Sequence, residues 1–422
     1  MKKNKVIILC LIIMIMISAC SKKTTKEKKE NILSEHSIEN ARSNYASDQE
    51  EVKTLSDRLD FSECSYDMFP DFNSFTSIKY NSLDPMPAKD SLDYMMKRFK
   101  ELGLDYIKEE DILDCKYTNN SKTEFLRAVD TISKINEFGE DSEYNNGGGF
   151  SYKDENVCLL MSYSQVYRFD DGRTSRYMNN ELKPNFTADG PNEDRCIAFV
   201  YKTAISDELV YDLADCQMSV AKASKIAEDY FMNIKDPYPV DPQIGFKTGE
   251  VWVYNCGEHK AYYLYLSRIY NNIPFLCGIP ETGGMRDEYN IFEDLLGVNI
   301  TDSSGVCSYY GPMERGRKIT ASGDVNYEML SLKDSVEMLS KQLAPNLRLK
   351  IKDAGLYYAK ILEAGIEWND TNIENSEYRL FWVFKGDNLN ENCRITVLVD
   401  VINGNIYMKF PDYSERDEKL MR

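Results

Sequence analysis

The sequence is poor in histidine, has no closely paired cysteines and is nearly free of long apolar segments. Only two histidines occur in 422 residues, His36 and His259. Because His36 stands near the N-terminus, a histidine-dependent catalytic triad or metal centre would rest on His259 alone. No two cysteines form a CxxC pair, which argues against a zinc ribbon. We therefore expect neither a metal ion nor another cofactor.

The cysteines also argue against a fully paired disulfide framework. Of the 11 cysteines, Cys10 lies in the N-terminal apolar segment and Cys20 ends it, which leaves an odd number in the rest of the chain. Most of these have apolar neighbours, as in Val157-Cys158-Leu159. We predict mainly buried free thiols, with one or two disulfides as the alternative.

One sign of charge dominates, since the formal net charge is −18 at pH 7. Such an acidic chain disfavours nucleic acid, which binds basic surfaces. It is compatible with cations, basic peptides and neutral ligands. The hydrophobic share of 42% is sufficient for packed cores, and the length predicts two or three domains.

The N-terminus has the pattern of a secretory signal peptide over residues 1–19. Basic residues precede an apolar run from Val6 to Ile17. The run is too short for an ordinary membrane helix, which needs about twenty residues. No second apolar run of membrane length follows.

Small residues and a cysteine, Ile17-Ser18-Ala19-Cys20, close this segment. These four residues resemble the lipobox of bacterial lipoproteins. The resemblance implies cleavage after Ala19 and a diacylglyceryl lipid on Cys20. It thereby implies a protein that is anchored in the cell membrane by this lipid and faces outside the cytoplasm.

Residues 20–50 are rich in Lys, Glu, Ser and Asn and contain few apolar residues. Such a segment cannot bury enough apolar surface to offset the entropy of ordering, so we predict a flexible tether. The predicted parts of the chain are the signal peptide 1–19, the tether 20–50, an N-terminal α+β domain 51–210, and two repeated units, 211–320 and 321–422.

Residues 51–210 mix helical and strand-like patterns. We predict helices over Ser91–Leu102 and Ser121–Phe138 and strands over Asn156–Phe169 and Arg195–Lys202. Ser91 is the expected N-cap of the first helix and Gly103 its stop. The adjacent carboxylates of Asp170 and Asp171 suggest calcium, but their spacing is not that of an EF-hand loop. A solvated turn is therefore favoured.

The second half contains an internal repeat of one helix followed by strands. Ser219 and Ser331, 112 positions apart, can each cap a helix through the side-chain oxygen. The predicted apolar stripes are Val220, Ala223, Ile226, Ala227 and Tyr230 in the first helix and Leu332, Val336, Leu339 and Leu343 in the second. The predicted strands that follow are Glu250–Tyr254, Ala261–Tyr270, Ala354–Leu362 and Glu377–Lys385.

Each unit closes on a strand followed by a glycine turn. The turns contain Asp302 and Gly305 in the first unit and Asp400 and Gly404 in the second. Both glycines are expected to adopt positive φ, which is cheap only for this residue. A helix followed by an antiparallel sheet buries one helix face on one sheet face. The fold class is therefore predicted as α+β, with an N-terminal α+β region and two helix-on-sheet units.

The stretch from Leu398 to Ile406 resembles the closing motif of PepSY-type modules of exported bacterial proteins. Thr301–Val306 resembles it more weakly, and Arg268–Phe275 is similar to the hairpin of that group. The whole chain also resembles uncharacterised lipoproteins of Gram-positive bacteria. The resemblance carries no catalytic residues, and it implies association with the regulation of peptidases or with envelope signalling. The simpler interpretation is that Asp400 and Gly404 only shape a turn.

Tyr263 and Tyr265 lie on one face of a predicted strand. Exposed tyrosines of this kind could bind a sugar or peptide, but cross-strand packing is the favoured explanation. The sequence thus predicts a non-enzymatic, lipid-anchored binding or regulatory protein for an envelope protein or peptide. A carboxylate-dependent envelope hydrolase is the main alternative, and a solute-binding lipoprotein of a transporter is a distant third.

Overall fold

The chain forms two compact units in its computed structural model. Unit 1 comprises Met1–Thr76, Gly323–Leu356 and Leu380–Met408, and unit 2 comprises Ser77–Ser322, Tyr357–Arg379 and Lys409–Arg422. The structure describes residues 36–80, 88–101, 103–117, 123–127, 129, 148–153, 157–162, 166–174, 200–233, 241, 243–256, 258–276, 289–292, 296–310, 319–363, 377–390 and 393–409. Helices and mainly antiparallel sheets confirm the α+β prediction.

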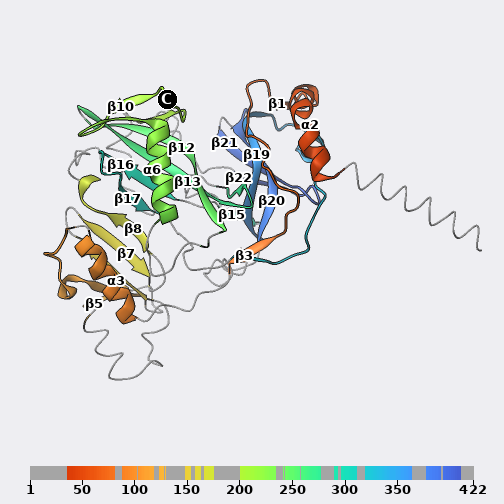
Figure 1. Ribbon diagram of the computed structural model, residues 1–422. Helices are drawn as coiled ribbons and strands as arrows, with labels where there is room; N and C mark the ends of the chain where they lie inside the picture. The colour runs from red at the N-terminus through yellow and green to blue at the C-terminus, as the bar shows by residue number, and fades with distance from the viewer. Residues whose placement is uncertain are drawn as a thin grey trace, which may run out of the picture. The chain divides into compact units, whose positions relative to one another are not determined.

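In unit 2 an antiparallel sheet of 11 described strands is the largest element (Figure 1). Its path runs β5-β4-β6-β7-β8-β17-β16-β13-β12-β9, with β14 paired to β13. The bounds are β4 Leu113–Tyr117, β5 Thr123–Arg127, β6 Gly148–Lys153, β7 Cys158–Ser162, β8 Val166–Asp170, β9 Val200–Thr203, β12 Ile244–Cys256, β13 His259–Tyr270, β14 Ile273–Pro274, β16 Gly297–Ile300 and β17 Val306–Tyr310.

Helix α6 (Val220–Asn233) packs on this sheet against β12, β13 and β17 (Figure 1). Tyr262 in β13 faces α6, because its hydroxyl donates to the Met218 carbonyl at 2.7 Å. Side chains alternate along a strand, so Leu264 shares that face while Tyr263 lies on the other. Unit 2 also contains β3 Ile78–Tyr80, α3 Ala88–Glu101, η2 Glu109–Asp111, β10 Val210–Asp212, β11 Gln217–Ser219, β15 Tyr289–Phe292 and β18 Ile319–Ala321.

Unit 1 holds the second helix-on-sheet segment and the first described part of the chain. Its sheet path is β1-β19-β20-β21-β22, and β2 also pairs with β19. The bounds are α2 Ile38–Glu51, η1 Val52–Thr54, β1 Leu59–Asp60, β2 Ser65–Tyr66, α7 Leu332–Gln342, β19 Leu349–Glu363, β20 Tyr378–Asn388, β21 Cys393–Asp400 and β22 Ile406–Lys409. The last residues of β19 and the first two of β20 belong to unit 2.

The two predicted repeats share a helix and four strands that neighbour one another in their sheet, namely β12-β13-β16-β17 and β19-β20-β21-β22. Their element orders differ in one respect, because β14 and β15 lie between β13 and β16 in the first repeat. The predicted equivalence of Ala261–Tyr270 and Glu377–Lys385 is confirmed, because β13 and β20 are each the second strand of the four. Ser219 accepts a hydrogen bond from the Lys222 amide and Ser331 from the Asp334 amide, so both predicted caps are confirmed.

The helices match position by position. Each buried residue of α6 has a buried counterpart 112 positions later, in or directly after α7. The pairs are Val220 and Leu332, Ala223 and Ser335, Ser224 and Val336, Ala227 and Leu339, and Phe231 and Leu343. Ile226 and Tyr230, predicted in the buried stripe, are only half-buried because Phe231 and Ser224 face the sheet in their place.

An aromatic residue of the second strand fastens each helix start. The Trp382 indole in β20 donates to the Leu330 carbonyl at 2.9 Å, as the Tyr262 hydroxyl donates to the Met218 carbonyl. Met218 and Leu330 are again 112 positions apart, one residue before each cap. Because Trp382 and Tyr262 are both buried, these polar groups need a partner inside the protein.

Further sequence predictions are wrong in the described residues. The predicted strand Asn156–Phe169 contains two strands, β7 and β8, which pair antiparallel with each other. The predicted tether includes residues 38–50, which form helix α2 instead, because docking on unit 1 buries Ile38, Ala41 and Tyr45. The predicted helix Ser121–Phe138 contains strand β5, since pairing with β4 overrides the helical spacing. Helix α3 begins at Ala88, so Ser91 is buried inside it rather than at its N-cap.

The predicted boundary at residue 210 does not separate compact units. Strand β8 of the predicted N-terminal domain pairs antiparallel with β17 of the first repeat, so both belong to one sheet. The predicted boundary at residue 320 lies close to Ser322, where the chain leaves unit 2. Residues 20–35 of the predicted tether lie outside the described residues.

Candidate functional site at the repeated turns

The first repeated turn joins β16 to β17. Asp302 is buried, and its carboxylate accepts from the Ser304 amide at 2.9 Å. Gly305 has φ +89°, which confirms the predicted positive φ. A Cβ on Gly305 would lie 3.3 Å from Cγ2 of Ile226, so this glycine also permits close approach to helix α6.

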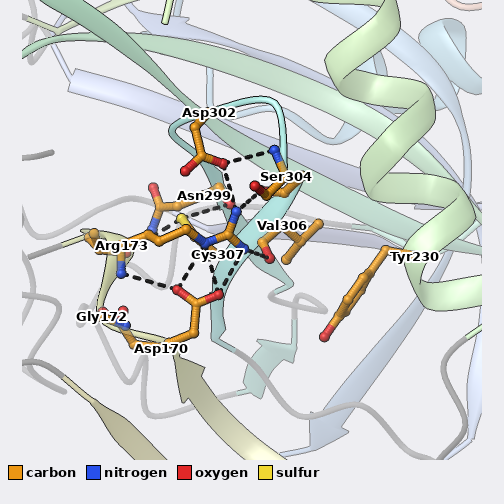
Figure 2. A network of polar contacts seen from close by, with 12 residues as sticks. Asp170, Gly172, Arg173, Tyr230, Asn299, Asp302, Ser304, Val306 and Cys307 are labelled. Carbon is orange, nitrogen blue, oxygen red and sulfur yellow. Dashed lines mark hydrogen bonds and ion pairs between the residues drawn. The ribbon is translucent and has the colours of Figure 1, made fainter. Parts of the chain in front are cut away.

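Arg173 binds this turn from the chain segment that follows β8 (Figure 2). Its guanidinium donates to Asp302 Oδ1 at 2.6 Å, to Asp171 Oδ2 at 2.7 Å and to the Val306 carbonyl at 2.7 Å. Burial lowers the pKa of Arg173, but the bonds and charges of Asp171 and Asp302 outweigh it and raise that pKa overall. These partly buried, charge-assisted hydrogen bonds join the segment after β8 to the turn, and we call the cluster of Arg173, Asp171 and Asp302 the lock.

The lock accounts for the acidic pair that suggested calcium. Asp171 binds Arg173 through both oxygens, and Asp170 Oδ1 accepts from the Gly172 amide at 3.0 Å. These carboxylates therefore bind groups of the protein itself. Among the described residues, no group of three or more His, Cys, Asp or Glu side chains could hold a metal ion.

A buried thiol lies beside the lock (Figure 2). Cys307 Sγ donates to the Asn299 carbonyl at 3.3 Å and lies 3.5 Å from the Thr174 hydroxyl. Burial raises the pKa of Cys307 to about 12, although bonds from Thr174 and Thr301 lower it. A thiol with so high a pKa is a poor nucleophile at neutral pH, so Cys307 has the character of a structural residue.

The second repeated turn joins β21 to β22. Asp400 is buried, and its Oδ1 accepts from the amides of Ile402 at 3.0 Å and Asn403 at 3.4 Å. Gly404 has φ +71°, so its predicted positive φ is also confirmed. A Cβ on Gly404 would collide with Cε of Met338, which stands 112 positions after Ile226. Both glycines thus pack against the same position of their helix.

A second polar cluster surrounds the N-terminus of α7. Asp48 in α2 is buried, and its Oδ2 accepts from the Lys333 amide at 3.2 Å. Ser331 and Asp334 form a capping box, and His36 Nδ1 lies 3.7 Å from Asp334 Oδ2. Burial raises the pKa of Asp48, while the bonds from Lys333 and Ser331 lower it.

Arg58 binds the other end of α7. Its Nη1 donates to the carbonyls of Leu343 and Ala344, both at 3.0 Å, and its Nη2 donates to the Ser340 carbonyl. Carbonyls at a helix C-terminus lack partners within the helix and attract cations. Residues 36–58 therefore stabilise both ends of α7.

Several predicted residues take no part in these clusters. His259 begins β13 and pairs in register with Cys256 of β12. Tyr263 and Tyr265 are buried and make an edge contact at 4.8 Å between ring centroids, so the structure favours packing over an exposed binding platform. The lipobox residues Ile17, Ser18, Ala19 and Cys20 lie outside the described residues, and no described helix is long and apolar enough to cross a membrane.

Free cysteines occur at four described positions. They are Cys64, Cys216, Cys256 and Cys307. Cys256 and Cys307 are buried, as predicted, whereas Cys64 and Cys216 are only half-buried. Sequence reasoning missed Arg173, whose only local signal was an arginine beside two aspartates, and it missed Asp48 and Arg58 in or next to the predicted tether.

Two solved structures resemble the chain, both at low sequence identity. No family model and no curated protein matches the chain. A crystal structure of an uncharacterized protein from Eubacterium rectale is similar at 12% identity and a TM-score of 0.47, covering 86% of this chain and 98% of that one. The YpeB C-terminal domain of Bacillus megaterium is similar at 11% identity and a TM-score of 0.18, covering 46% of this chain and 99% of that one. Neither similarity bears on function.

Proposed function

We propose that the chain is a lipid-anchored, extracytoplasmic protein that binds or regulates an envelope protein or peptide without catalysis. The anchor rests on the lipobox residues Ile17 to Cys20 and the basic and apolar residues before them. The resemblance of the closing turns to PepSY-type modules supports a regulatory role. The acidic net charge supports a protein or peptide partner over a nucleic acid.

The observation that carries the proposal is how the buried carboxylates are used. Asp302 and Asp171 bind Arg173, and Asp400 accepts from the amides of its own turn. A general acid or base needs a carboxyl group that can reach a substrate proton. The carboxylates of these turns instead fasten parts of the protein together.

A carboxylate-dependent hydrolase is the second candidate, favoured by the raised pKa of Asp48. Against it, Asp48 lies between two helices and caps the Lys333 amide, which is a structural use of the group. The third candidate, a transporter's solute-binding lipoprotein, requires alternating βα units. The antiparallel neighbours in the sheet of unit 2 do not support it.

The anchor is tested with Cys20→Ala in the cell that makes the protein. We expect the wild type in membrane pellets with a lipid on Cys20, detected by mass spectrometry of the N-terminal peptide. The variant should be released or remain an unprocessed precursor. Equal membrane partition and normal processing of both proteins would contradict the anchor.

The absence of catalysis is tested separately on the purified chain without its lipid. Peptide and glycan substrates of the envelope are incubated with wild type and with Asp48→Asn. We expect no turnover by either protein, whereas cross-linking in intact cells should join the lipidated wild type to a specific envelope protein. Turnover by the wild type that Asp48→Asn abolishes would replace the proposal with the hydrolase.

A further inference from the structure

Helix α2 is the first described helix and follows directly on the segment that leads from Cys20. Its sequence, IENARSNYASDQEE, is mostly polar, and its buried residues are Ile38, Ala41, Tyr45 and Asp48. Burial of apolar surface is the main source of docking energy, so three apolar residues hold this helix only weakly. Buried Asp48 weakens it further, since a charged group is costly to bury.

The helix also carries charge of the unfavourable sign at its end. Asp48, Glu50 and Glu51 lie in its last turns, and no basic residue does. The C-terminal end of a helix has a partial negative charge, so these carboxylates destabilise α2 as an isolated helix. Its helical state therefore depends on contacts outside it.

Those contacts all lie within unit 1, and they include an ion pair of Arg42 with Asp71 at 3.4 Å and a hydrogen bond from Arg42 to the Phe72 carbonyl. At the start of α2, the Ile38 amide donates to the Tyr327 carbonyl at 3.2 Å, and the His36 carbonyl accepts from the Met329 amide at 2.7 Å. At its end, Glu51 pairs with Lys333 at 2.7 Å, and Asp48 accepts from the Lys333 amide.

The middle of α2 covers an aromatic side chain. The Tyr45 ring stacks on the Trp382 ring with 5.7 Å between centroids, and the Tyr45 hydroxyl donates to the Asp67 carbonyl at 2.7 Å. Trp382 is fully buried in this arrangement. Departure of α2 would uncover one face of Trp382 and remove the partner of the Lys333 amide.

We propose that α2 is a strap that detaches from unit 1 as a single unit while the sheet beneath it stays folded. Detachment exposes the N-terminus of α7 and the face of Trp382, and it converts α2 into additional tether. The strap is the described helix nearest in sequence to Cys20. This inference stands on contacts within unit 1 and does not depend on the proposed function.

Hydrogen exchange of the full chain, resolved to single amides by fragmentation, tests the strap. We expect the amides of α2 to exchange at least about tenfold faster than those of β20 and β21, as for a local opening. The Lys333 amide should exchange with α2, because Asp48 holds it. The Asp334 amide should stay slower, because Ser331 of α7's own cap holds it. Exchange of α2 at the rate of β20 and β21 would overturn the proposal.

Two variants sharpen the measurement. Tyr45→Ala should accelerate exchange in α2 and at Lys333 by a further factor of about ten while leaving β20 and β21 unchanged. Tyr45→Phe keeps the stacking on Trp382 and should have a smaller effect. Glu39→Gln changes an exposed residue of the first turn and is the control. Equal acceleration of β20 and β21 by Tyr45→Ala would show that α2 opens only with the whole unit, against the proposal.

Discussion

In the first repeat the turn aspartate is held by an arginine from outside the repeat, whereas in the second the helix itself is held from outside. Arg173 follows β8, the strand next to β17, and binds Asp302, whereas residues 36–58 bind both ends of α7. The shared features are internal: the serine cap, the buried helix positions, the aromatic bond to the helix start and the glycine against the helix. The two copies thus share the same internal contacts. The chain before the repeats binds the turn in the first copy and the helix in the second.

The largest expected effect comes from removing the side chain that is particular to the first copy. Arg173→Ala removes the cation that Asp171 and the buried Asp302 share, and it should lower the free energy of unfolding of unit 2 by about 3–5 kcal/mol. Arg173→Lys keeps one charge but loses the forked geometry, so its loss should be smaller. Denaturant unfolding measures this loss of stability, and hydrogen exchange of residues 297–310 and 393–409 compares the two turns. An equal loss of protection at both turns would contradict the claim that Arg173 stabilises only the first.

Truncation of the helices tests the shared features. Leu339→Ala removes a fully buried side chain from α7 and should cost about 2–5 kcal/mol. Ile226→Ala removes a half-buried side chain from α6 and should cost about 1 kcal/mol, since less apolar area is involved. Denaturant unfolding of both variants measures the difference. A larger loss for Ile226→Ala would mean that the buried stripe of α6 is misassigned.

Substitution of the two turn glycines should lower the stability by different amounts. Gly305→Ala and Gly404→Ala each place a Cβ at positive φ, which costs about 1 kcal/mol or more. Gly404→Ala should cost slightly more, because the flexible end of the Met338 side chain must also move away from the new Cβ. Adding Met338→Ala to Gly404→Ala should relieve the collision but leave the backbone strain. Additive losses in this double-mutant cycle would show that the two residues do not meet.

The smallest expected effect is a pH dependence particular to the second copy. Because burial raises the pKa of Asp48, the folded state binds a proton more readily than the unfolded state does. Stability should therefore fall as pH rises from the ordinary value of 3.8 through the raised value. The charged groups around Asp48 are Glu51, Lys333, Asp334 and His36.

Asp48→Asn isolates this effect, because it keeps an acceptor for the Lys333 amide and cannot ionise. The stability of the wild type relative to Asp48→Asn should decrease as pH rises through that range. Urea unfolding of both proteins across the range measures the difference. A relative stability that increases with pH would mean that the bonds from Lys333 and Ser331 outweigh burial.

Local patterns predicted the shared features of the repeat because their signals are local. The caps at Ser219 and Ser331, the α7 stripe and the positive φ of both glycines each follow from a few adjacent residues. The stripe of α6 was partly wrong, since several of its residues are apolar and only the packed sheet selects the buried set. Strand β5 was missed because sheet pairing overrode helical spacing.

The contacts that hold each copy from outside the repeat could not be predicted from local patterns. Arg173 and Asp302 are 129 positions apart, and Asp48 and Lys333 are 285 apart, so no sequence spacing joins them. Helix α2 has a composition typical of a tether, and its order comes from docking on a surface made by distant residues. In the sequence, a polar residue that makes such a contact cannot be distinguished from one that is exposed to solvent.

A crystal structure of the full chain, with α6-β12-β13-β16-β17 superposed on α7-β19-β20-β21-β22, tests the similarity of the two repeats most directly. With Ser219 placed on Ser331, Ile226 and Met338 should coincide above their turn glycines. The Tyr262 and Trp382 side chains should reach the carbonyls of Met218 and Leu330 from the same side. Helices that superpose only after a shift in register, or turn glycines that face away from them, would contradict the account.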